Sequence, residues 1–345
     1  MNCAHSAVKF RANTNNYMLN LEMKLREDLF ETKEQKPTRD GFGIGVVEAG
    51  KENQNVVVLC ADLTESTRVE EFKKTFPERF IEVGVAEQNL AALASGFAAY
   101  GKVPFITSYA TFSPGRNNEQ IRTTISINRM PVKVCGMHAG VSVGPDGATH
   151  QALEDIALMR VQPGMTVISP CDAEEGRKAT RAAAQLNAPV YLRFGREKTP
   201  MMTTSETPFE IGKANVVWRT ETPQVAIFAT GPLLFNALTA ARDLEAQGIH
   251  ATVINVHTIK PLDEETILRE AGAAKAVVTV EEHQIAGGLG SAIAELLAQK
   301  LPRPIEFIGV RDSFGQSGNP SELIEHYGMG RSHIAEAVKR ATSRV

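Results

Sequence analysis

The chain has 345 residues, of which 43% are hydrophobic and 22% are charged, a composition typical of a globular protein. Its length favours two domains, because one domain commonly holds about 100–200 residues. The formal net charge of −3 gives no electrostatic reason to expect nucleic acid or an acidic membrane as a partner, and no apolar stretch reaches the ~18 residues that span a bilayer.

Residues 1–37 are predicted to be an appendage that contains one helix over 19–30. The first residues lack the apolar core of a secretion signal, so we expect a cytoplasmic protein, with an organelle transit peptide as the alternative. The cysteines Cys3, Cys60, Cys135 and Cys171 are widely spaced and form no CxxC motif. This pattern favours reduced, inert thiols over a disulfide framework or a zinc site.

Residues 38–198 are predicted to form the first domain. Thr38 precedes an expected helix over 39–51, and short apolar strands are expected at 56–60, 80–83, 103–107, 132–137, 165–169 and 190–194. Between them, EQNLAALASGFAA places apolar residues at i, i+3, i+4 and i+7, which predicts an amphipathic helix. Apolar strands that alternate with such helices indicate an α/β fold whose parallel sheet is covered on both faces, a doubly wound domain.

Residues 199–223 are predicted to be a linker, because this segment is polar and contains three prolines. Residues 224–345 return to the α/β pattern and predict a second doubly wound domain. Its strands are expected at 225–229, 251–256, 276–280 and 305–310, and its helices near 236–247, 290–300 and 333–340.

Glu87 is the first candidate for chemistry, in the sequence FIEVGVAEQNLAALASG. A strand ends at Val83, Gly84 turns the chain, and Glu87 stands at the start of the next helix. A carboxylate at that place is favoured by unpaired backbone amides and by the helix dipole, so a helix-initiating acid is one interpretation. Ligands of parallel sheets bind at such strand ends, so a catalytic acid is the other interpretation.

A glycine-rich loop over 136–157 is the second candidate. It carries His138, Asp146 and His150 among glycines that permit close backbone approach to a ligand. These side chains suit phosphate binding or general acid–base chemistry, and a turn aspartate followed by a helix-capping histidine is the structural alternative. No third His or Cys nearby completes a metal set, so we expect no metal site in this chain.

Aromatic and arginine side chains follow two further strands. Tyr109 and Phe112 are three residues apart, a spacing that is typical of core but also suits one wall for a planar heterocycle. Arg193 and Arg196 close another strand in RFGR. The donor fork of arginine suits phosphate or carboxylate, with a surface ion pair as the ordinary alternative.

Taken in order, ADLTES, VGVAEQN, SYATF, GPDGATHQ and LRFGR resemble the pyrimidine-binding domain of transketolases over residues 38–198. The EEHQIAGGLGSAIAE stretch and its α/β surroundings resemble the C-terminal domain of the same family. The resemblance implies an enzyme that uses thiamine diphosphate to move a two-carbon ketol unit from a ketose phosphate to an aldose phosphate.

The resemblance also implies how the cofactor is held. Glu87 matches the glutamate that bonds the aminopyrimidine ring. A carboxyl there favours the imino tautomer, which removes the proton from the thiazolium carbon. Tyr109 and Phe112 match the aromatic positions that flank this ring, and Asp62 matches a position that lines the cofactor cavity.

The substrate pocket is implied in the same way. His138 and His150 match histidines that contact substrate hydroxyls and the developing alkoxide. Asp146 matches the acidic residue that reads the hydroxyl stereochemistry of the donor. The positions that grip the sugar phosphate are matched by Arg39, Ser66 and Arg193, with Arg196 as an additional candidate.

The chain departs from the family pattern in two respects. The GDG motif and the asparagine that hold Mg²⁺ and the diphosphate are absent, as is the whole N-terminal domain of the family. This predicts a separate N-terminal subunit that carries the GDG motif and supplies most of the ligands of Mg²⁺. The two kinds of subunit would form an α₂β₂ heterotetramer. The residues Gly115 and Arg116 lie in a segment that lacks an aromatic residue expected after Phe112.

Three alternatives stay open. Deoxyxylulose-phosphate synthase shares similar motifs but has arginine at the position of His138, and the beta subunit of pyruvate-type dehydrogenases differs in the histidine loop. A non-catalytic partner subunit is the third alternative, although it would not need Glu87, His138, Asp146 and His150 together. The sugars are not determined, with pentose-phosphate metabolites as the default.

Overall fold

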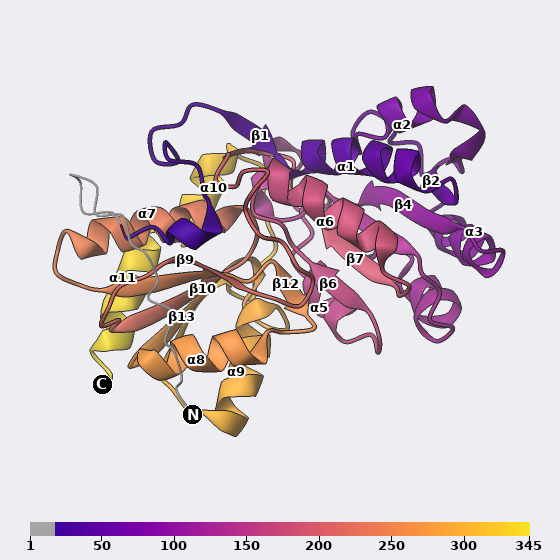
Figure 1. Ribbon diagram of the computed structural model, residues 1–345. Helices are drawn as coiled ribbons and strands as arrows, with labels where there is room; N and C mark the ends of the chain where they lie inside the picture. The colour runs from indigo at the N-terminus through magenta and orange to yellow at the C-terminus, as the bar shows by residue number, and fades with distance from the viewer. Residues whose placement is uncertain (1–17) are drawn as a thin grey trace, which may run out of the picture.

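The computed structural model describes residues 18–345, so Cys3 and the beginning of the predicted appendage lie outside the described residues. The chain forms two α/β units that lie side by side (Figure 1). Each unit is built on a mainly parallel sheet that helices cover, which confirms the predicted fold class.

The first unit contains a seven-stranded sheet. All neighbouring strands are parallel except the pair at one edge, β12 and β6, which is antiparallel. In spatial order the strands are β12 (Thr258–Lys260), β6 (Thr166–Ile168), β7 (Val190–Arg193), β5 (Lys133–Met137), β4 (Val103–Tyr109), β2 (Val56–Cys60) and β3 (Phe80–Glu82).

Helices cover both faces of this sheet, with α1 and α6 packed against each other on one of them (Figure 1). The helices are α1 (Thr38–Glu52), α2 (Glu70–Thr75), α3 (Glu87–Ala99), α4 (Asn118–Gln120), α5 (Asp155–Arg160) and α6 (Ala173–Gln185). The short helical turns are η2 (Pro77–Arg79), the π-type η3 (Ile121–Ser126) and η4 (Val141–Asp146).

Strand β2 shows why this layer forms. All five of its side chains are buried. Val57 and Leu59 belong to the core on one face of the sheet, whereas Val56, Val58 and Cys60 belong to the core on the other face. A strand that buries both faces must be apolar at every position, because successive side chains point in opposite directions.

The second unit contains a five-stranded sheet, parallel except for β9, which pairs antiparallel with β11. In spatial order its strands are β14 (Ile305–Val310), β13 (Ala276–Gln284), β10 (Val225–Ala229), β11 (Ala251–Asn255) and β9 (Asn215–Trp218). Its helices are η5 (Gly231–Leu233), α7 (Leu234–Glu245), α8 (Glu264–Ala273), α9 (Leu289–Lys300), α10 (Pro320–His326) and α11 (Arg331–Thr342).

The two units are joined by more than a linker. Strand β12 comes from the C-terminal part of the chain but completes the edge of the first sheet. One hydrophobic core contains Leu59 of the first sheet together with Phe228 of the second. The short sheet of β1 (Gln35–Pro37) and β8 (Lys198–Pro200) ties the start of the first unit to its end.

Two predictions about local structure differ from the observed fold. The expected helix over 19–30 is only a three-residue 3₁₀ turn, η1 (Leu21–Met23), which Lys24 ends in the left-handed conformation with φ 46°. The backbone of Asn20 and Arg26 instead bonds to Val217 and Met202, so tertiary partners replace the helical hydrogen bonds.

The segment 199–223, predicted as a linker, contains the buried strand β9 at the edge of the second sheet. Its apolar run of three residues is too short to distinguish from a connection, and its pairing partner β11 lies more than thirty residues later in the chain. Within 18–345, no helix is long and apolar enough to cross a membrane.

Candidate active site

Most of the predicted site residues lie where strands of the first sheet end. Asp62 follows β2, Tyr109 ends β4, His138 follows β5 and Arg196 follows β7, while Glu87 begins the helix after β3. These strands are neighbours and parallel, so their carboxyl ends share one edge of the sheet. The topology therefore gathers side chains that are far apart in sequence along the edge where α/β folds bind ligands.

Glu87 is buried at this edge, with 2% of its surface exposed. It is the first residue of α3, and the preceding Ala86 supplies no side-chain cap, so the carboxylate lies near unpaired helix amides. Arg116 Nη1 donates to Glu87 Oε2 at 2.7 Å, and Ser108 Oγ lies 3.5 Å from the other oxygen. Asn117 donates to the Glu87 carbonyl at 2.9 Å, which fixes the start of the helix.

Four rings cluster beside this carboxylate. Tyr109 and Phe112 stack with centroids 6.0 Å apart, and Tyr109 lies 3.9 Å from the ring of His138. His150 meets both aromatic rings edge-on, at 5.8 Å and 5.4 Å. The predicted aromatic pair and the two predicted histidines thus form one continuous wall, as a planar ligand would require.

His138 is 2% exposed and adopts φ 55°, a left-handed conformation that histidine tolerates better than most residues. Its Nε2 lies 3.2 Å from Arg39 Nη1, and its Nδ1 is buried without a partner. Burial, followed by the charges of Arg39 and Arg196, lowers the pKa of His138 to about 3. The ring is therefore neutral at physiological pH and offers a free nitrogen for a hydrogen bond to a ligand.

The arginines around His138 form the electropositive part of the site. Arg39 Nη1 also donates to the backbone oxygen of Ser66 at 2.8 Å, and its Nε is buried without a partner. Burial and the nearby charge of Arg68 lower the pKa of Arg39. Arg196 is 36% exposed and pairs with Asp146 at 3.1 Å. These groups suit an anionic ligand, because guanidinium donors match phosphate geometry.

Arg193, which is predicted to grip the sugar phosphate, lies in a buried polar network between the two units. It is 4% exposed, donates to both oxygens of Asp155 at 2.8 Å and 3.3 Å, and donates to the Glu282 carbonyl at 2.8 Å. Tyr191 completes the network by donating to Asp155 at 2.6 Å. The Nε and Nη2 donors of Arg193 therefore bond to groups of both units, Asp155 of the first and the Glu282 carbonyl of the second.

The glycine-rich loop also packs differently from the prediction. Gly140 has φ 90°, and a Cβ there would lie 2.2 Å from Glu282 Oε1 of the second unit. At Gly147, with φ 74°, a Cβ would lie 2.7 Å from Ser317 Oγ. These two glycines permit close approach of the second unit rather than of a ligand.

The sequence analysis missed the interdomain network and the contact of Arg116 with Glu87. Two adjacent glutamates and a histidine end the otherwise apolar strand β13, and this pattern was a usable signal for a buried polar network. Among residues 18–345, no group of three or more His, Cys, Asp or Glu side chains is arranged to hold a metal ion.

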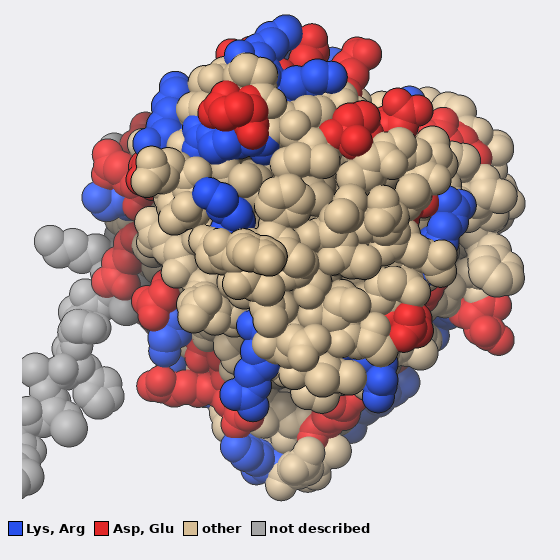
Figure 2. All heavy atoms as spheres, turned by 90° about the vertical axis from the view of Figure 1, so that its right-hand side faces the viewer, with Lys and Arg blue, Asp and Glu red and all other residues tan. Residues whose placement is uncertain are grey.

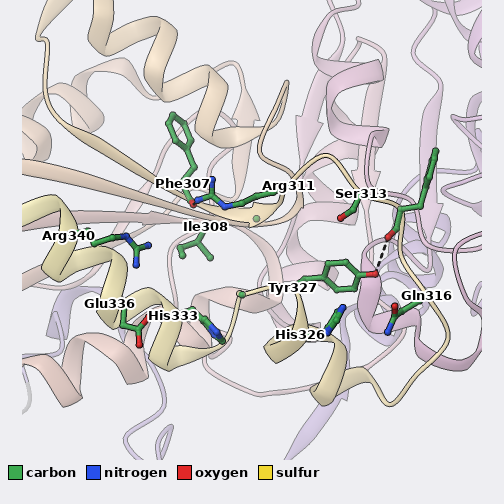
Figure 3. A pocket seen from close by; sticks show the side chains of 13 residues that line it. Phe307, Ile308, Arg311, Ser313, Gln316, His326, Tyr327, His333, Glu336 and Arg340 are labelled. Atoms are coloured by element: carbon green, nitrogen blue, oxygen red, sulfur yellow. Dashed lines mark hydrogen bonds between the residues drawn. The ribbon is translucent and has the colours of Figure 1, made fainter.

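A separate cavity of about 570 Å³ lies in the second unit, between β14 and the helices α10 and α11 (Figure 3). None of the predicted site residues lines it. One of its charged side chains already has a carboxylate partner, because Arg340 Nε pairs with Glu306 at 3.2 Å. The edge of the first sheet therefore remains the candidate active site.

Comparisons with known proteins agree with this geometry. Residues 34–202 match the family "Transketolase, pyrimidine binding domain", and residues 212–334 match "Transketolase, C-terminal domain". The chain belongs to the transketolase family. This confirms the predicted resemblance, and the chain corresponds to the C-terminal section of the family.

Several relatives of this transketolase-family chain are themselves separate sections. A "Putative transketolase C-terminal section" of Methanocaldococcus jannaschii is 42% identical, over 88% of this chain and 95% of that protein. The "6-deoxy-6-sulfo-D-fructose transketolase subunit SqwH" of Clostridium sp. is 39% identical, over 91% and 98%. The solved structure "Split gene transketolase, inactive beta4 tetramer" is 43% identical, with a TM-score of 0.83, and the match covers 89% of this chain and 98% of that one.

Proposed function

We propose that this transketolase-family chain transfers a two-carbon ketol unit from a ketose phosphate to an aldose phosphate, with thiamine diphosphate and a separate N-terminal subunit. The observation that carries the proposal is the edge of the first sheet. There a buried carboxylate, two stacked aromatic rings and two histidines lie together, with arginines beside them.

The residues fit the aminopyrimidine half of thiamine diphosphate. Glu87 would accept a hydrogen bond from the ring, Tyr109 and Phe112 would flank it, and Asp62, exposed after β2, would line the cavity. When bound, this cofactor supplies the nucleophilic carbon and the electron sink for the reaction. The buried setting of Glu87 keeps its hydrogen bond out of competition with water.

The sugar phosphate would lie along the histidines and arginines. The partnerless Nδ1 of His138 supports this placement, because a substrate hydroxyl would supply the hydrogen bond that this buried nitrogen lacks. The neutral ring of His138, together with His150, would bond the substrate hydroxyls and the oxygen on which negative charge develops. Asp146 would read a hydroxyl, while Arg39, Arg196 and Ser66 would hold the phosphate.

The N-terminal subunit would carry the GDG motif, bind Mg²⁺ with the diphosphate, and form an α₂β₂ heterotetramer with this chain. Figure 2 faces the side of the molecule on which α3 lies, where charged side chains are sparse over a broad area. Val85, Leu93 and Tyr100 are exposed apolar residues at or near α3. A sparsely charged face that carries exposed hydrophobic side chains next to Glu87 supports docking of a protein partner. Three buried, free thiols support a cytoplasmic setting.

Pentose phosphates are the default substrates of the proposal. Relatives are named for other sugars, among them a sulfo-sugar in Clostridium sp., and the anion-binding arginines are compatible with either a phosphate or a sulfonate. Substrate panels should therefore include both kinds of anionic sugar.

The deciding experiment mixes the full chain with a GDG-bearing N-terminal subunit, thiamine diphosphate and Mg²⁺, and measures ketol transfer. We expect activity only in the mixture, and a loss of about 10²–10⁴-fold in kcat for Glu87→Gln. Glu119→Gln makes the same chemical change at an exposed acid. It is the matched control and should retain activity.

Wild-type turnover by Glu87→Gln in the mixture would refute the assignment of Glu87. Inactivity of a well-formed complex would favour a non-catalytic subunit or another reaction. Decarboxylation of a 2-oxo acid would then point to a synthase or dehydrogenase, because both use the same cofactor with such donors.

A further inference from the structure

Arg116 makes two contacts that matter beyond its ion pair. Its guanidinium bonds Glu87 Oε2 at 2.7 Å and lies 4.7 Å from the ring centroid of Phe112. These are the two groups that the proposed function assigns to the aminopyrimidine ring. A guanidinium is planar and delocalised and carries N–H donors, so it shares with an aminopyrimidine the features that both partners recognise.

The backbone holds Arg116 in place for these contacts. Its amide donates to the Phe112 carbonyl at 2.9 Å, and the preceding Gly115 donates to the Ala110 carbonyl at 3.2 Å. A Cβ at Gly115 would lie 2.0 Å from the Thr111 carbonyl oxygen, so only glycine fits this turn. The distance between the Arg116 backbone and the ring of Phe112 is therefore set by the fold.

The side chain itself is free to leave. Arg116 is 49% exposed, whereas Glu87 is 2% exposed, so the guanidinium reaches the carboxylate from the solvent side. Within residues 18–345, Glu87 is its one hydrogen-bond acceptor, and a rotation about the side chain would release it without disturbing the turn. Opening this ion pair moves only the half-exposed arginine side chain and leaves the buried carboxylate in place.

We propose that Arg116 occupies the aminopyrimidine subsite of the chain when no cofactor is bound, and that it must swing out before the cofactor enters. This inference rests on the proposed function. The arginine acts as a plug: it satisfies the buried carboxylate and covers Phe112, and it competes with the cofactor for both. The apparent affinity for the aminopyrimidine is lowered by the fraction of molecules in which the plug is closed.

The test measures binding of 4-amino-2,5-dimethylpyrimidine to the full chain by calorimetry. We expect Arg116→Ala to bind this probe about tenfold more tightly than wild type, a change that corresponds to a plug closed in about nine wild-type molecules in ten. Arg122→Ala removes an exposed arginine six residues later, outside the contacts described, and should bind the probe as wild type does.

The inference would be overturned if Arg116→Ala bound the probe as tightly as wild type or more weakly, since Arg116 would then not compete with the probe. It would also be overturned if neither protein bound the probe detectably. Arg116→Lys serves if the alanine variant does not fold. Its ammonium still pairs with Glu87 but presents no planar group to Phe112, so about threefold tighter binding is expected and unchanged binding counts against the plug.

Titration of thiamine diphosphate into the mixture with the N-terminal subunit separates this inference from the proposed function. If the wild-type mixture does not bind the cofactor, the proposed function fails. The wild-type mixture can instead bind the cofactor while Arg116→Ala and wild type have equal affinity for the pyrimidine probe and for thiamine diphosphate. In that case only the plug inference fails.

Discussion

Replacing Arg193 by methionine should destabilise the protein and leave phosphate binding intact, although its place in RFGR first suggested a phosphate contact. Arg193 and Asp155 are 4% and 1% exposed, so the substitution leaves a buried carboxylate without its charge partner. Removing one member of a buried pair costs about 3–5 kcal/mol, and the lost bond to the Glu282 carbonyl adds roughly 1 kcal/mol.

Urea unfolding of the full chain measures this loss, with Arg196→Met as the matched control. Arg196 is 36% exposed and pairs only with a half-exposed Asp146, so its loss should change the free energy of unfolding by less than about 1 kcal/mol. In the mixture with the N-terminal subunit, the same control should raise KM for phosphorylated sugars about 10- to 100-fold.

The double variant Arg193→Met/Asp155→Asn sharpens the test. The asparagine carries no charge and can still accept the bond from Tyr191, so the double variant should recover about 2 kcal/mol of the loss. The reasoning would be refuted if Arg193→Met kept wild-type stability while raising KM selectively for phosphorylated sugars.

Three further predictions concern stability. Gly41→Ala should lower the free energy of unfolding in urea by about 1–3 kcal/mol, because its Cβ would lie 1.8 Å from a backbone oxygen of α6. The Cβ of Gly96→Ala meets nothing within 4 Å, so this substitution should raise the free energy of unfolding by about 0.5–1 kcal/mol. Equal effects of the two substitutions would contradict this reasoning. Burial lowers the pKa of His257 from 6.5 to about 3, so its contribution to stability is complete above pH 6.5 and is lost as the pH falls toward 3. Between pH 7 and pH 5, the free energy of unfolding of His257→Gln should fall by about 2 kcal/mol less than that of wild type. Equal falls in the two proteins would argue against a neutral buried ring. Asp172→Ala should cost about 3 kcal/mol by thermal or urea unfolding, because its carboxylate caps α6 and accepts bonds from Met202 and Thr203; a loss below 1 kcal/mol would show that water replaces them.

The amino-acid sequence predicted much of the fold because the relevant signals are local. Strands β2 and β10 lie where continuous apolar runs placed them, since a strand buried on both faces has no polar positions. The segment 19–30 failed as a helix for the opposite reason, because its backbone partners lie near 200–217 and no local pattern reports them.

The candidate site divides in the same way. Motif order alone placed Glu87, Tyr109, Phe112, His138 and His150 in one site, because parallel strands bring their carboxyl ends to a common edge. In the folded chain the ring of Tyr109 lies against His138, and the ring of Phe112 lies against His150.

By itself, the sequence determined the family, the two α/β units and the edge at which the candidate residues gather, since each follows from periodicity and motif order. Only the tertiary structure decided that Arg193 pairs with buried Asp155 while Arg196, three residues later, stays accessible. The same is true of Arg116, which bonds to Glu87 and contacts the ring of Phe112. The physical reason is that the availability of a donor depends on which distant groups have already satisfied it, and those groups become neighbours only when the chain is folded.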